Sequence, residues 1–141
     1  MRAAALALLF LGPLGAQEIA IQQVGEQSAL QARVDALTKA RDWAGLADLL
    51  EVQNPKQRGV FLETWLSALT RAGRHERALE ICNAALPQIE AKTGPRLSLV
   101  RICRAQALSA LGRRDEALAA HLENGRLGYT TGFAPALMTA A

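Results

Sequence analysis

The chain has 141 residues, which is enough for one domain with a single core. Half of its residues are hydrophobic but only 4% are aromatic, so the apolar content is chiefly Ala and Leu, and the formal net charge is +3. Because Ala and Leu favour helices and β-branched runs are nearly absent, the composition excludes a strand-rich protein and predicts an all-α fold.

Residues 1–16 have the pattern of a cleaved signal peptide. Arg2 supplies a short positive start, an apolar stretch runs over 3–11, and Gly12 precedes Pro13 and the small residues up to Ala16. The apolar stretch is too short for a permanent transmembrane helix, which needs about 20 residues. We therefore expect cleavage after Ala16, a periplasmic or secreted protein, and no stable membrane anchor. The alternative interpretation is a buried N-terminal helix.

Residues 17–26 lack a helical period and predict a flexible lead-in. After them one sequence motif recurs along the chain, starting at Ala36, Ala68 and Ala107. We call the three copies the first, second and third repeats. The second and third repeats are offset by 39 residues and the first and second by 32. The second and third repeats share six identical pairs: Ala68/Ala107, Leu69/Leu108, Gly73/Gly112, Arg74/Arg113, Ala78/Ala117 and Leu79/Leu118.

Each repeat has the signature of a helix–turn–helix hairpin. Gly73 and Gly112 stand where a positive φ ends a helix at low cost, whereas the first repeat has Arg41 there. Acidic residues follow, as at the start of a second helix. Asn54 followed by Pro55 is a typical helix start. We expect first helices over 55–72 and 95–111, and a second helix that Pro87 ends or kinks.

Apolar residues in the two predicted first helices recur at spacings of three and four, the pattern of a core-facing stripe. In the second repeat they are Phe61, Trp65, Leu66, Leu69 and Ala72; in the third they are Leu97, Val100, Cys103, Ala107, Leu108 and Leu111.

These hairpins resemble the tetratricopeptide repeat (TPR) family over residues 27–125. The residues that carry the resemblance best are Leu62, Trp65, Leu66, Leu69, Gly73, Ala78 and Ala85. The resemblance implies an all-α, right-handed solenoid of about three helix–turn–helix units. The repeat spacings bracket the family's length without equalling it. Arg101 and Arg104 stand where the third repeat should have packing residues, and other α-hairpin repeat families are an alternative.

A concave surface lined by the first helices is the binding site that the resemblance implies. Its expected residues are Gln31, Asp35, Thr38, Glu63, Ser67, Thr70, Arg71, Ile102, Gln106 and Ser109. Most are polar or small, which suits an extended peptide or partner helix, and Arg71 is the expected anchor for a carboxylate. We therefore expect a protein–protein interaction module, an adaptor or assembly subunit of an envelope complex. The alternatives are a ligand- or glycan-binding protein and a self-assembling structural protein.

The sequence contains few of the motifs that are typical of enzyme active sites. His75 and His121 have no metal-ligand spacing around them, and no nucleophile elbow or phosphate-binding glycine loop is present. We expect no enzyme activity, no metal and no cofactor. Cys82 and Cys103 are the only cysteines, and export favours a disulfide between them; two buried free thiols are the alternative.

The C-terminal part of the chain is basic, with six arginines against three acids over 96–141. A polyanion-binding patch is one interpretation, but scattered arginines are more typical of a solvated helix face, and we expect no nucleic-acid partner. The segment 126–141 predicts a tail that either covers the last hairpin or docks on a partner.

Overall fold

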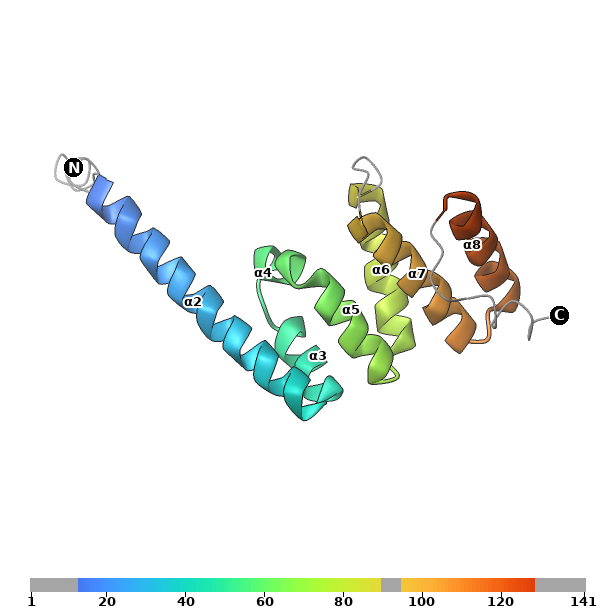
Figure 1. The fold of residues 1–141 in the computed structure, drawn as a ribbon, viewed down its shortest axis with the longest axis horizontal. Helices are drawn as coiled ribbons and strands as arrows, with labels where there is room; N and C mark the ends of the chain where they lie inside the picture. Colours follow the sequence, from blue (N-terminus) through green and yellow to red (C-terminus); the bar gives the residue numbers. More distant parts are fainter. Residues whose placement is uncertain (1–12, 90–94, 129–141) are drawn as a thin grey trace, which may run out of the picture. The chain divides into compact units, whose positions relative to one another are not determined.

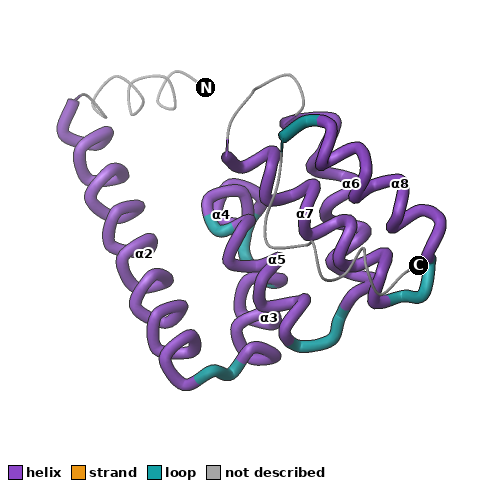
Figure 2. The backbone as a smooth tube through the Cα atoms, turned by 45° about the vertical axis from the view of Figure 1, so that its right-hand side comes forward, coloured by secondary structure: helices purple, strands orange, loops and turns teal. Residues whose placement is uncertain are grey.

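The computed structural model describes residues 13–89 and 95–128, and these residues form helices and connecting turns without a strand (Figure 2). The helices are α2 (Pro13–Ala40), α3 (Trp43–Glu51), α4 (Pro55–Val60), α5 (Leu62–Arg71), α6 (His75–Ile89), α7 (Pro95–Ala110) and α8 (Arg114–Arg126). The all-α prediction is thus confirmed for this part of the chain. Residues 1–12 of the expected signal peptide and residues 129–141 of the expected tail lie outside the described residues.

The chain divides into two compact units, with the boundary between Arg41 and Asp42. The N-terminal unit contains helix α2. Residues 17–26, predicted as a flexible lead-in, are part of this helix, so that prediction was wrong. Their side chains are exposed, and the segment contains three Gln and two Glu beside two Ile, one Val and one Gly. This half of α2 is therefore helical without a buried apolar stripe, the signal on which the prediction relied.

The C-terminal unit is built from α3 to α8. Helix α5 packs against α3, α6 and α7, and α7 in turn packs against α6 and α8, as the ribbon shows (Figure 1). The fully buried side chains at the centre include Leu46, Leu50, Leu66, Leu69, Cys82, Val100 and Leu108. Most residues of the two predicted stripes are buried, so the helical period identified the core-facing sides of α5 and α7 correctly.

Left-handed residues end the first helix of each hairpin. The φ angles of Gly73 and Gly112 are 76° and 73°. The residue that follows each glycine donates its amide to the carbonyl five residues earlier in the chain, from Arg74 to Leu69 (2.8 Å) and from Arg113 to Leu108 (3.0 Å). This Schellman geometry satisfies carbonyls that the helix end would otherwise leave without partners. The sequence repeat of 39 residues is therefore also a repeat of turn geometry.

The helix boundaries differ from the prediction within the segment 55–72. Asn54 caps the predicted start at Pro55 as expected, with its Oδ1 accepting from the Gln57 amide at 2.9 Å. The predicted helix 55–72 is nevertheless two helices, because Phe61 leaves the helical region with φ −100° and ψ 21°. Pro87 does not end α6, which continues to Ile89.

The predicted disulfide is wrong, because Cys82 on α6 and Cys103 on α7 are both free and buried. Burial raises the pKa of the Cys82 thiol to about 12, and the nearby Cys103 adds to this shift. Burial also raises the pKa of Cys103. The packing of α6 on α7 thus brings the two sulfurs close enough to interact but does not bond them, and both side chains fill core space.

No described helix has both the length and the apolar character that a membrane span requires.

Candidate functional site

The two helices predicted to line a binding surface, α5 and α7, pack against each other in the C-terminal unit. The predicted site residues on them define the α5–α7 face: Glu63, Ser67, Thr70 and Arg71 from α5, and Ile102, Gln106 and Ser109 from α7. All seven are half-buried or exposed, so none belongs to the core. Their assignment to a binding surface rests on the family resemblance and stays a prediction.

The other three predicted residues lie on α2, in the N-terminal unit. Gln31 donates to the Asp35 carboxylate at 2.8 Å, and the Thr38 hydroxyl donates to the Val34 carbonyl at 2.8 Å. Both bonds join residues one helical turn apart. These polar groups are therefore occupied within their own helix.

Arg71 makes the most distinctive contact of the α5–α7 face. Its guanidinium carbon lies 4.5 Å from the centroid of the Trp43 ring, which belongs to α3 and is half-buried. A cation over an aromatic face is attracted by the ring quadrupole, by about 0.5–1 kcal/mol at an exposed site. The stack holds the planar guanidinium in place while its edges still carry N–H donors that match a carboxylate.

Glu63 is joined to α7 by an ion pair. Both of its carboxylate oxygens accept from Arg96, with Nε at 2.5 Å and Nη2 at 3.2 Å. Glu63 was predicted to be available to a partner. In the structure its ion pair with Arg96 connects the starts of α5 and α7. Arg96 was missed, since a pair 33 residues apart along the chain leaves no local signal.

The far end of the face turns toward α8. The Ser109 hydroxyl lies 3.4 Å from Nε2 of His121 on α8. Burial lowers the pKa of His121, which favours the neutral imidazole. Thr70 donates to the Leu66 carbonyl at 2.8 Å within its own helix. Ser67 is exposed at the middle of α5 and is the residue best placed to test the face without disturbing a bond.

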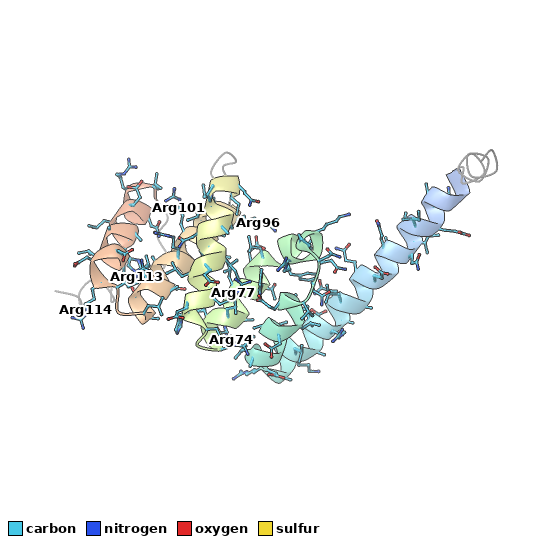
Figure 3. The ribbon with its side chains drawn as sticks, turned by 180° about the vertical axis from the view of Figure 1, so that it is seen from behind. Arg74, Arg77, Arg96, Arg101, Arg113 and Arg114 are labelled. Atoms are coloured by element: carbon cyan, nitrogen blue, oxygen red, sulfur yellow. The ribbon has the colours of Figure 1, made fainter. Side chains whose placement is uncertain are left out.

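A second candidate site was not predicted. It is a cavity of about 300 Å³ on α6, α7 and α8, which we call the arginine hollow. Its lining residues are Leu86, Arg101, Arg104, Glu116, Ala119, Ala120, Glu123 and Asn124. Figure 3 labels Arg101 on α7 together with Arg113 and Arg114 at the start of α8.

The polar groups of the hollow are held by bonds to neighbouring helices. Arg104 donates through Nε to Oδ1 of Asn83 on α6 at 2.7 Å. Asn124 is only 4% exposed and donates to the Arg101 carbonyl at 3.2 Å. Bonds of this kind restrict the side-chain rotamers, so the lining is ordered before any ligand arrives.

Both glutamates of the hollow are engaged by arginines of their own helix or its cap. Arg113 binds Glu116 through two nitrogens, at 2.8 and 2.7 Å, and Arg126 binds Glu123 in the same manner, at 3.0 and 2.7 Å. These bonds lower the pKa of both carboxyls, and the charges of Arg104 and Arg101 lower them further. The two glutamates are thus ionised at neutral pH and already paired.

The sequence did contain one signal for the hollow. Arg101 and Arg104 interrupt the packing pattern of the third repeat, but the sequence alone gave no reason to connect them with Asn124 on the following helix. The connection depends on the register in which α7 packs on α8, and the repeat pattern does not specify this register.

No family model, curated protein or solved structure matches this chain. Within the part of the chain that the structure describes, no group of three or more His, Cys, Asp and Glu side chains is arranged to hold a metal ion.

Proposed function

We propose that this chain is an exported protein–protein interaction module of stacked TPR-like hairpins, which binds a peptide or helix of its partner on the α5–α7 face. The observation that supports the proposal most directly is the stack of Arg71 on Trp43. Tryptophan and arginine are the residue types that most often dominate binding energy at interfaces. Here they meet on the outer side of the unit rather than in its core.

The chemistry of the face favours a segment with a carboxylate at its centre. Arg71 offers a guanidinium fixed by stacking, and Ser67 offers a hydroxyl one helical turn earlier. Ile102 and Gln106 add half-buried contact area on α7. A face of this size suits a short segment, so the module would act as an adaptor or assembly subunit rather than as a scaffold for a large protein.

The experiment is a crosslinked pull-down of the full-length protein from the envelope fraction of its native host, read by mass spectrometry. Ser67→Arg places a bulky charge on the α5–α7 face, and Arg114→Gln changes an exposed arginine on α8 as the matched control. We expect one partner, in near-equal amounts with the wild type and Arg114→Gln, and its loss with Ser67→Arg. Circular dichroism of each variant verifies that the helices form.

Three results would contradict the proposal. Recovery of the wild-type protein without a partner would favour the ligand- or glycan-binding alternative. Recovery of further copies of the chain alone, together with an elution volume that falls with protein concentration on size-exclusion chromatography, would favour self-assembly. Equal partner recovery with Ser67→Arg would place the binding surface elsewhere.

A further inference from the structure

The arginine hollow occupies a position that apolar side chains fill in the preceding hairpin. The offset of 39 residues relates Arg101, Arg104 and Ala120 to Leu62, Trp65 and Ile81. The three residues of the second repeat are 8%, 4% and 7% exposed and belong to the core. The third repeat thus replaces two large apolar side chains by arginines and one by alanine, at positions where packing alone favours the apolar residue.

Two further positions of the lining, Asn124 and Glu116, also differ from their counterparts in the second repeat. The half-buried Ala85 of α6 corresponds to Asn124, a buried polar residue. Arg77, whose guanidinium lies 5.8 Å from the Trp65 ring centroid, corresponds to Glu116. An aromatic ring covered by an arginine in one hairpin is therefore replaced by an arginine beside a glutamate in the next. The outcome is a cavity with an ordered polar lining instead of a packed contact.

We infer that the arginine hollow is a binding site for a compact organic anion, one that carries carboxylate or phosphate groups. A volume of about 300 Å³ lies at the small end of the range for small-molecule sites. Arg104 is the anchor: Asn83 fixes its Nε edge, and its two terminal nitrogens carry four further N–H donors in the geometry that matches a carboxylate or phosphate.

The electrostatics of the hollow select an anion over a cation. Glu116 and Glu123, which would attract a cation, are each bound by two nitrogens of a neighbouring arginine. With the two glutamates paired in this way, the positive charge of Arg104 remains to attract an anion. The inference does not depend on the proposed protein partner, because none of the lining residues belongs to the α5–α7 face.

The test is a titration of the full chain at constant ionic strength with citrate, succinate and inorganic phosphate, against sodium chloride as the reference. Binding is read by isothermal calorimetry and by the rise of the melting temperature. We expect saturable binding to at least one of these probes but not to chloride. Tighter binding of citrate or succinate than of phosphate would indicate a carboxylate ligand. Tighter binding of phosphate would indicate a phosphate compound.

Two variants locate the site. Arg104→Gln removes the anchor, and Ala120→Ile restores the larger residue of the preceding repeat and reduces the cavity. Each is expected to raise the dissociation constant about tenfold or more, whereas Arg114→Gln, which removes an exposed arginine outside the lining, leaves it unchanged. Backbone NMR shifts on adding the anion should centre on the amides of Leu86, Ala119 and Asn124.

The inference would be overturned by either of two results. The first is a wild-type response to all three probes no larger than the response to chloride. The second is binding that Arg104→Gln and Ala120→Ile leave unchanged while Arg114→Gln weakens it, which would indicate nonspecific attraction to surface arginines. Because the NMR readout uses the wild type alone, it decides the matter even if a variant fails to fold.

Discussion

Arg41 adopts the same left-handed backbone conformation as Gly73, with φ angles of 56° and 76°. The two residues hold equivalent places in the first and second repeats, and each amide donates to the carbonyl three residues back, at 3.1 and 3.2 Å. In the described residues Arg41 is the one side-chain-bearing residue with a positive φ. The turn geometry is thus retained even where the glycine is absent.

Arg41→Gly is therefore expected to stabilise the protein. The left-handed conformation costs a residue with a Cβ about 1–2 kcal/mol, and the larger unfolded-state entropy of glycine offsets part of the gain. We expect the free energy of unfolding to rise by about 0.5–1 kcal/mol in a urea titration followed by helical circular dichroism. Arg33→Gly, in the exposed interior of α2, is the control and should lower it by about 1 kcal/mol.

Gly73→Ala tests the same geometry in reverse. A Cβ at Gly73 would meet nothing within 4 Å, so the cost comes from the φ of 76° and not from a clash. We expect the free energy of unfolding to fall by about 1 kcal/mol. Gly125→Ala is the matched control, because a Cβ there also meets open space but its backbone is helical; this variant should be stabilised by up to about 1 kcal/mol. Equal effects of the two variants would contradict this explanation.

The cysteine prediction concerns thiol reactivity. Because both thiols are free, buried and raised in pKa, in the case of Cys82 to about 12, the folded protein at pH 8 should react with a thiol reagent at least about a hundredfold more slowly than the protein in urea. In urea without reductant, two thiols per chain should titrate. A count of zero would mean that the two cysteines are bridged after all.

The stability of the chain should fall on mild acidification because of His121. Burial lowers the folded-state pKa of His121 below its ordinary value of 6.5. The unfolded chain therefore binds a proton more readily, so the contribution of neutral His121 is complete above about pH 6.5 and is lost as the pH falls toward the folded-state pKa.

His121→Gln removes this titration but keeps a polar group near Ser109. Urea titrations at pH 7.5 and 5.5 should therefore show a smaller loss of stability for His121→Gln than for the wild type. An equal loss would contradict the assignment. The comparison stays above pH 5 because the pKa values of Asp48, Glu116 and Glu123 are lowered by arginines, and their contributions are lost only at more acidic pH.

The sequence was most informative where structure is determined by neighbouring residues. The glycine that ends a helix, the cap at Asn54 and the apolar stripe of α5 all act within a few residues, and all three were predicted. The helix over 17–26 was missed because its side chains are exposed and it lacks the apolar period that the prediction required.

The errors in the candidate site have a different origin. The expected bond between Cys82 and Cys103 depends on how α6 is rotated and shifted against α7, which helical periods do not determine. The pairing of Glu63 with Arg96 and the burial of Asn124 likewise depend on contacts between helices. The residues of the α5–α7 face were assigned from the family resemblance and lie outside the core, whereas the arginine hollow required three helices to be placed together.

The packing of the C-terminal unit also predicts how this unit unfolds under a mechanical pulling force. Helices α5 to α8 make their extensive contacts with helices one or two places away along the chain. A pull on the two ends would therefore load one helix interface at a time instead of shearing many bonds in parallel. We expect such a chain to extend in small successive steps at low force, with the α7–α8 hairpin able to detach while the α3–α5 packing persists.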